Sequence, residues 1–140
     1  MIEIKSVSKI YTNGEIETQA LSDVSLTIEK GEFIVILGPS GSGKSTMLNV
    51  LSGLDMPTKG EITIAGHPIS SMNHRLLTEF RRTNLGFIFQ QYNLLSTLTV
   101  YENVALGHHL GTKKMSVEEM LTIVGLHEHQ KKYPHQLSGG

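Results

Sequence analysis

Hydrophobic residues at the start of the chain recur at every second position, which is the spacing of a β-strand. Ile2 and Ile4 begin this pattern, and it returns more loosely between residues 16 and 21. Asn13-Gly14 lies between the two stretches and is a dipeptide that favours the positive φ angles of a tight turn. We therefore predict an antiparallel β-hairpin at the start of the chain. Val24 to Ile28 also alternates with the period of a strand.

Two short segments are apolar at almost every position. Phe33 to Leu37 is the first, and Leu85 to Phe89 is the second. A strand that is apolar on both faces is typical of the interior of a parallel sheet, so we predict a buried strand at each segment. Glu61 to Ala65 again has strand period and leads into a turn predicted at Gly66-His67-Pro68.

Other segments have the 3.6-residue spacing of helices. One begins at Lys44 and ends near Gly53, one covers Leu76 to Arg82, and one covers Thr99 to Leu106. A fourth covers Ser116 to Val124, where Ser116 with Glu119 predicts a capping box. The order predicts a β-hairpin followed by a βαβ-like core over residues 1–90, and a helical part over residues 91–140.

Composition excludes several classes of function. The chain carries 12 Lys and Arg against 13 Asp and Glu, a net charge of −1, which argues against a dedicated nucleic-acid binder. It has no Cys, so disulfides, thiolate zinc sites and thiol nucleophiles are excluded. The longest apolar run, Phe33 to Leu37, is much shorter than the roughly 20 residues that a membrane helix needs. We expect a soluble, intracellular chain whose membrane role, if it has one, goes through a partner.

A phosphate-binding motif lies between the first apolar segment and the first helix. Gly38-Pro39-Ser40-Gly41-Ser42-Gly43-Lys44-Ser45 fits the pattern G-x-x-x-x-G-K-[ST] in the strand-to-helix context that the motif requires. Glycines let backbone N–H groups point inward toward phosphate oxygens, and the helix adds its positive N-terminal end. Lys44 is expected on the β and γ phosphates, the Ser45 hydroxyl on Mg²⁺ and Thr46 on the α phosphate. The alternative is a glycine turn that contains Lys-Ser by chance.

The chain ends with Leu137-Ser138-Gly139-Gly140. With the phosphate-binding loop, this sequence resembles an ABC transporter ATP-binding subunit, whose signature motif begins LSGG. The resemblance implies an α/β fold, that of a P-loop NTPase of ABC type. It consists of an N-terminal antiparallel β subdomain, a RecA-like core and a helical subdomain that is incomplete here. ATP and Mg²⁺ are the implied cofactors, and ATPase activity is implied for the full-length protein.

The resemblance also implies three further site residues or groups. Ser138, Gly139 and Gly140 would face the γ phosphate held by a second ATP-binding subunit in a head-to-tail dimer; a flexible polar tail is the alternative. Gln90 would be the Q-loop residue, which reaches Mg²⁺ or the attacking water, although Gln90 and Gln91 are also plausible as ordinary loop residues. Tyr11 would stack on adenine, or else be a half-buried strand aromatic. Lys44 and Gln90 are thus the candidate catalytic residues.

The subgroup most similar to this chain serves lipoprotein release, macrolide export or antimicrobial-peptide export. The Leu54-Asp55 segment and the stretch from Gln90 to Val104 carry this likeness. It implies a transmembrane permease as partner, contacted by Leu94 to Val100, and a cytoplasmic location, peripheral on the inner face of the cell membrane. A hydrophobic satellite of the helical part is the alternative for Leu94 to Val100.

One part of the family pattern is missing. A complete subunit has an apolar strand that ends in Asp-Glu after LSGG, and no four apolar residues followed by an acidic pair occur in this sequence. We therefore expect an N-terminal portion of a longer ATPase that does not turn over alone. The alternatives are a soluble ABC-type ATPase of DNA repair or translation, and a non-hydrolysing ATP-binding fragment. His108-His109 and His127-x-His129 suggest a metal, but solvated histidines are favoured.

Overall fold

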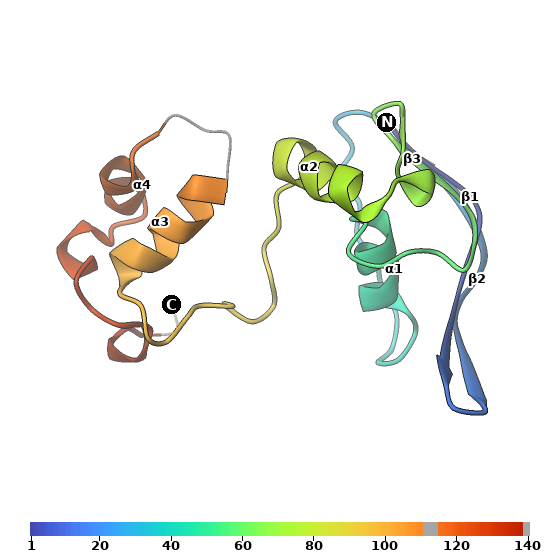
Figure 1. Cartoon of the computed structure of the whole chain (residues 1–140), viewed down its shortest axis with the longest axis horizontal. Helices are drawn as coiled ribbons and strands as arrows, with labels where there is room; N and C mark the ends of the chain where they lie inside the picture. Colours follow the sequence, from blue (N-terminus) through green and yellow to red (C-terminus); the bar gives the residue numbers. More distant parts are fainter. Residues whose placement is uncertain (111–114, 139–140) are drawn as a thin grey trace. The chain divides into compact units, whose positions relative to one another are not determined.

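The computed structural model describes residues 1–110 and 115–138. The chain forms two compact units, Met1–Arg81 and Arg82–Gly140, and each is described by itself (Figure 1). The first unit contains β1 (Ile2–Asn13), β2 (Ile16–Ile28), α1 (Lys44–Leu51), β3 (Lys59–Ile64), β4 (His67–Pro68), the 3-10 turn η1 (Ile69–Ser71) and most of α2 (His74–Asn84). The second contains α3 (Val100–Leu110), α4 (Val117–Ile123), η2 (His127–His129) and η3 (Pro134–Gln136). Among the described residues no helix is both long and apolar enough to cross a membrane.

The strands of the first unit form one antiparallel sheet in the order β2-β1-β3-β4. The predicted hairpin is confirmed, but its turn is one residue later than expected. Asn13 pairs with Ile16, so Gly14 and Glu15 form the turn, and only Gly14, with φ 62°, has a positive φ angle. A two-residue turn with a positive φ at its first position alone needs glycine there, so Asn13 ends the strand instead.

A second turn also differs from the prediction. Ala65 and Gly66 make the turn, and His67-Pro68 forms β4, which pairs with Thr63 and Ile64 of β3. Ala65 and Gly66 both have positive φ angles, 49° and 81°. The predicted turn at Gly66-His67-Pro68 was therefore placed too late, because Ala65 adopts a conformation that its residue type rarely does.

The first core lies where the sheet meets α1 and α2. Nine buried side chains come from the sheet, α1, η1 and α2: Ile4, Val7, Leu21, Val50, Ile62, Ile64, Ile69, Leu77 and Phe80. The helix predicted from Lys44 is confirmed, and the amides of Leu54 and Asp55 both donate to the Asn49 carbonyl, at 2.9 and 3.1 Å. These bonds close the end of α1 and hold Asp55 at a fixed place beside the sheet.

The two apolar segments predicted as buried strands are not strands. Residues 33–37 and 85–89 lack regular secondary structure, and Phe33 is 90% and Ile88 103% exposed. A strand needs a neighbour that completes its hydrogen bonds. Within the described ranges no strand pairs with either segment, so their hydrophobic sequence alone does not make them strands.

The second unit is built on α3 and α4. Val100, Val117 and Leu121 are its buried centre, and five partly buried side chains pack against them: Tyr101, Val104, Ala105, Leu126 and Leu137. The capping box predicted at α4 is confirmed, because the Ser116 side chain accepts from the Glu119 amide and the Glu119 carboxylate accepts from the Ser116 amide. Thr99 and Glu102 make the same reciprocal pair at the start of α3.

The start of α3 is bonded to chain segments on both sides of it in sequence. Val100 donates its amide to the Lys132 carbonyl at 2.8 Å, and Tyr101 donates to the Gln130 carbonyl at 3.0 Å. The Asn103 side chain donates to the carbonyls of Leu95 and Leu98, both at 3.1 Å, and accepts from the Leu95 amide at 2.8 Å. The turn before α3 and the segment that leads to Leu137 are thereby joined to one helix end.

Candidate functional site

The glycine-rich loop meets α1 with an open helix end. Gly43 is the residue before the helix, with φ 85° in the left-handed region, and Gly41 has φ 81°. The helix has no side-chain cap and no acidic residue in its first turn. A carboxylate in this turn would compete with an anionic ligand. Because the first turn of α1 has none, the positive end of the helix dipole is available to a negatively charged ligand.

The Lys44 ammonium lies over this loop. Its Nζ donates to the Gly38 carbonyl at 2.9 Å and to the Pro39 carbonyl at 2.6 Å. These are neutral acceptors, and among the described residues no carboxylate forms an ion pair with this ammonium. An ammonium with three donors, held by carbonyls at the mouth of an open helix end, is suited to bind phosphate oxygens.

Contact with β2 fixes the position of the loop. A Cβ atom on Gly43 would lie 2.4 Å from the Ala20 carbonyl oxygen and 3.3 Å from Leu21 Cδ2. Only glycine therefore lets the loop approach the hairpin this closely. The loop and the hairpin are consequently one site in space, although more than 20 residues separate them along the chain.

The hydroxyl residues of the motif differ in their exposure. Ser40, Ser42 and Ser45 are exposed, whereas Thr46 is half-buried in the first turn of α1. Ser45 offers one oxygen, and Mg²⁺ keeps several waters and needs few protein ligands. The donor set fits a magnesium ion that is held mainly by a triphosphate.

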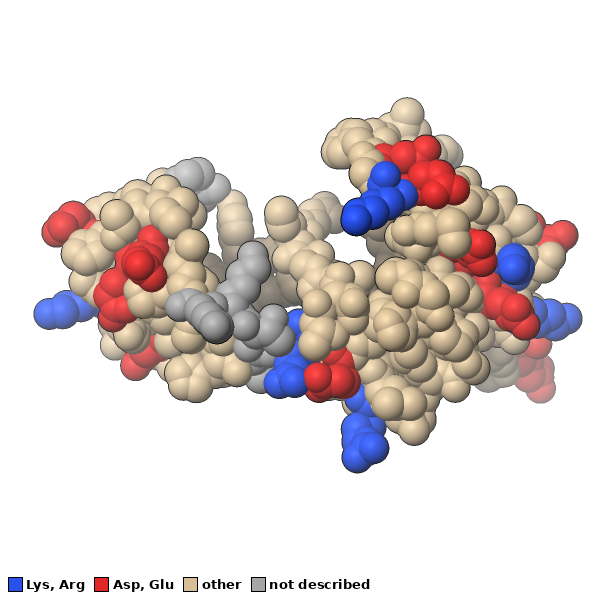
Figure 2. Space-filling view, turned by 90° about the horizontal axis from the view of Figure 1, so that it is seen from above, with Lys and Arg blue, Asp and Glu red and all other residues tan. Residues whose placement is uncertain are grey.

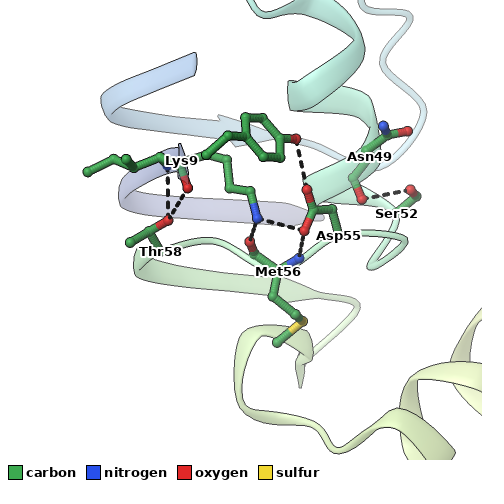
Figure 3. A network of polar contacts seen from close by, with 8 residues as sticks. Lys9, Asn49, Ser52, Asp55, Met56 and Thr58 are labelled. Atoms are coloured by element: carbon green, nitrogen blue, oxygen red, sulfur yellow. Dashed lines mark hydrogen bonds and ion pairs between the residues drawn. The ribbon is translucent and has the colours of Figure 1, made fainter. Parts of the chain in front are cut away.

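Tyr11 lies on β1, opposite Thr18 of β2. Its hydroxyl donates to Asp55 Oδ2 at 2.8 Å, and the Lys9 Nζ lies 4.8 Å from the centre of its ring (Figure 3). The residue remains 41% exposed. The ring is therefore held at its hydroxyl and over one face while part of it stays open to solvent.

Asp55 is bonded to Lys9, Tyr11 and Met56, and these four residues form the Asp55 cluster. Its Oδ1 accepts from Lys9 Nζ at 2.6 Å and from the Met56 amide at 2.7 Å, and Lys9 also donates to the Met56 carbonyl at 2.8 Å (Figure 3). Partial burial opposes ionisation, but the bonds from Lys9, Tyr11 and the Met56 amide outweigh it, and the pKa of the Asp55 carboxyl lies below its usual range. Sequence reasoning missed this cluster, because Asp55 and Lys9 are 46 positions apart.

The remaining predicted site residues belong to the second unit. Gln90 follows the segment 85–89 in an exposed bend, and Ser138 follows Leu137, which packs in the helical core. Gly139 and Gly140 lie outside the described residues. Tyr11 and residues 38–46 both belong to the first unit, where the loop meets β2 at Ala20 and Tyr11 pairs with Thr18 of the same strand. The roles of these residues, and those of Gln90, Ser138, Gly139 and Gly140, stay predictions.

Charge and metal-ligand distribution add little to these features. On the face that Figure 2 shows, the described Lys and Arg side chains lie apart, with acidic side chains and uncharged surface between them. In the part of the chain that the structure describes, no three His, Asp or Glu side chains are grouped as metal ligands. His108 and His109 contact each other only edge-on, with ring centres 6.0 Å apart.

Comparison with known proteins decides the family. The model of the ABC transporter family matches residues 21–140. The chain belongs to the ABC transporter family. An uncharacterized ABC transporter ATP-binding protein of Methanocaldococcus jannaschii is 50% identical over all of this chain and 65% of its own length.

Relatives of opposite transport direction are equally similar. The macrolide export ATP-binding/permease protein MacB of Hyphomonas neptunium is 44% identical over all of this chain and 22% of its own length. The methionine import ATP-binding protein MetN of Ralstonia nicotianae is also 44% identical, over all of this chain and 41% of its own.

A solved ATP-binding cassette has the same fold. The dimeric cassette MJ0796, in a post-hydrolysis state bound to ADP and Pi, is 42% identical with a TM-score of 0.86. The match covers 99% of this chain and 64% of that one. The predicted α/β fold of an ABC ATP-binding domain is confirmed, and the chain spans less than two thirds of the length of these relatives.

Proposed function

We propose that this chain binds MgATP with residues 38–46, and that the protein carrying it is the ATP-binding subunit of an ABC transporter. In this role the protein hydrolyses ATP and couples the reaction to transport through a membrane permease. The observation that carries the proposal is the Lys44 ammonium, bonded to the carbonyls of Gly38 and Pro39 beside an uncapped helix end.

The residues divide the work of binding as follows. Lys44 exchanges its carbonyl acceptors for the β and γ phosphate oxygens, which are charged and therefore stronger acceptors. The amides at the start of α1 bind the phosphates, and Thr46 adds a hydroxyl near the α phosphate. Ser45 holds Mg²⁺, which neutralises charge on the phosphates when it is bound. Tyr11 offers its ring to the adenine.

Other parts of the proposal rest on the second unit and on relatives. Gln90 would orient the attacking water and reach Mg²⁺, and Ser138, Gly139 and Gly140 would cover the γ phosphate of a second copy in a head-to-tail dimer. A dimer and its ADP and Pi are known for the cassette MJ0796. Leu94 to Val100 is proposed to contact the permease, at the inner face of the membrane, because Leu94 and Leu95 are each 49% exposed.

We assign transport to the export direction from the likeness of Leu54-Asp55 and of residues 90–104 to the lipoprotein, macrolide and antimicrobial-peptide subgroup. Overall identity does not separate an exporter from an importer, since MacB and MetN match equally well. Measuring transport into inverted vesicles against right-side-out vesicles tests the direction.

Substitution of Lys44 tests the central proposal. In the protein that carries this chain, Lys44→Ala is expected to weaken ATP binding by about tenfold or more, since a charge-assisted hydrogen bond contributes about 1.5–3 kcal/mol. The matched control is Lys5→Ala, which removes the same charge from a side chain that is 69% exposed and pairs only at 3.7 Å with Glu3. Isothermal titration calorimetry with ATP measures both. Equal affinities for the two variants would overturn the proposal.

A further inference from the structure

The Asp55 cluster connects two ends of the proposed nucleotide site. Asp55 follows the C-terminal end of α1, the helix that begins with Lys44, and its side chain bonds to Tyr11 and Lys9 on β1 (Figure 3). Asn49 helps to hold this place, because its carbonyl accepts from the Asp55 amide at 3.1 Å. Through Asp55, the position of Tyr11 is thus fixed by α1, the same helix whose first turn is proposed to bind the phosphates.

Tyr11 is within reach of a nucleotide bound at the loop. Its pairing partner Thr18 is two positions from Ala20, whose carbonyl lies against Gly43. A strand rises about 3.3 Å per residue and neighbouring strands are about 4.8 Å apart, so the Cα of Tyr11 is about 8 Å from that of Ala20. The loop therefore meets the hairpin within two residues of the position opposite Tyr11, which is close enough for one nucleotide to contact both.

The orientation of the ring is restricted in two ways. The hydroxyl is fixed by Asp55 at 2.8 Å, and the Lys9 ammonium lies over one face, 4.8 Å from the ring centre. Lys9 is itself fixed, since its side chain is 13% exposed and bonded to both Asp55 and Met56. A base can therefore stack only on the face opposite Lys9.

Resting on the proposed function, we infer that Asp55 is a positioning residue for the nucleotide base. It acts through Tyr11: the carboxylate holds the phenol so that the free face of the ring is already oriented before ATP arrives. Without the carboxylate the ring rotates about its side-chain bonds, and ordering it becomes part of the cost of binding. The phosphate contacts are untouched, so the effect is confined to ligands that carry a base.

The test compares ATP with inorganic tripolyphosphate in the protein that carries this chain. Asp55→Ala and Tyr11→Phe are each expected to weaken ATP binding about three- to tenfold, the range for ordering one flexible side chain. Affinity for tripolyphosphate should change less than twofold. Asp55→Asn keeps an oxygen that accepts from the Tyr11 hydroxyl and should bind ATP like the unsubstituted protein.

A double substitution separates positioning from a purely structural role. If Asp55 acts through Tyr11, the combination of Tyr11→Phe with Asp55→Ala is no weaker for ATP than either alone, whereas independent effects multiply. If Asp55→Ala does not fold, Tyr11→Phe against Asp55→Asn carries the test alone. Normal ATP affinity of Tyr11→Phe, multiplied effects, or parallel loss of tripolyphosphate binding would each overturn the inference. Loss of ATP binding in Lys44→Ala supports the proposed function in every one of these cases, so the two ideas fail separately.

Discussion

The contact between Gly43 and β2 gives a prediction with a built-in control. Gly43→Ala would place a Cβ atom 2.4 Å from the Ala20 carbonyl oxygen, at a residue with φ 85°. Gly41→Ala has nearly the same backbone, with φ 81°, but nothing lies within 4 Å of its Cβ position. The two variants therefore share the backbone strain and differ in the collision.

The size of the effect follows from these two contributions. Left-handed backbone in an alanine costs about 1–2 kcal/mol, and we expect both variants to lose that amount of unfolding free energy. Overpacking adds about 1–3 kcal/mol, in Gly43→Ala alone, because the atom it meets is backbone and cannot rotate away. Gly43→Ala should also displace the loop from the hairpin and weaken ATP binding.

Urea unfolding without nucleotide measures the difference. With a slope of about 2 kcal/mol per molar urea, the midpoint of Gly43→Ala should lie about 0.5–1.5 M below that of Gly41→Ala. Calorimetry with ATP then measures how much the displacement of the loop in Gly43→Ala weakens ATP binding. Equal midpoints for the two variants would refute the argument that close approach to Ala20, rather than backbone conformation alone, requires glycine at residue 43.

Two further predictions concern the helical unit. Leu121 is 1% exposed and lies at the centre of this unit, so Leu121→Ala should lower the free energy of unfolding by about 2–5 kcal/mol. Ile123 is 71% exposed, so Ile123→Ala should change the free energy of unfolding by less than about 0.5 kcal/mol. Urea unfolding compares the two variants, and similar losses would contradict the assigned core. Hydrogen bonds from the amide and hydroxyl ends of Thr99 and Ser116 hold the pKa values of Glu102 and Glu119 below their usual range. These bonds stabilise the ionised carboxylates and so lower their folded pKa values. Their contribution to the free energy of unfolding is therefore complete above the unfolded pKa near 4.5 and is lost as the pH falls through the lowered folded values. Circular dichroism from pH 7 to pH 3 should therefore show a loss of helix that is smaller when Glu102→Gln and Glu119→Gln are combined, and an identical loss in both proteins would contradict the capping argument.

Local sequence rules were sufficient for elements that are stabilised by their own residues. The hairpin, the helix from Lys44 and the capping box at Ser116 depend on periodicity, a glycine and a short-range bond, all of which are visible in the sequence. The turn at Gly14-Glu15 was displaced by one residue because Asn13 and Gly14 both tolerate positive φ, and only pairing selects between the two positions.

Features that depend on distant partners were not predictable in this way. Phe33 to Leu37 has the sequence of an interior strand, yet a strand exists only where a neighbour accepts its hydrogen bonds, and the described residues provide none for it. The Asp55 cluster is the opposite case, because it forms in the structure although the sequence does not predict it. Nothing in its local sequence indicates that Asp55 meets Lys9 and Tyr11, because the fold creates that contact.

The bonds at the start of α3 make the helical unit mechanically continuous. The Asn103 side chain donates to the Leu95 carbonyl in the turn before the helix, and the amides of Val100 and Tyr101 donate to the carbonyls of Lys132 and Gln130. Leu95 and the carbonyls of Gln130 and Lys132 are thus bonded to the same helix end, so we expect a displacement of Leu95 to move the segment that leads to Leu137 as well. Replacing Asn103 would remove the bonds to Leu95 and Leu98, and we then expect the turn before α3 to move independently of residues 130–132.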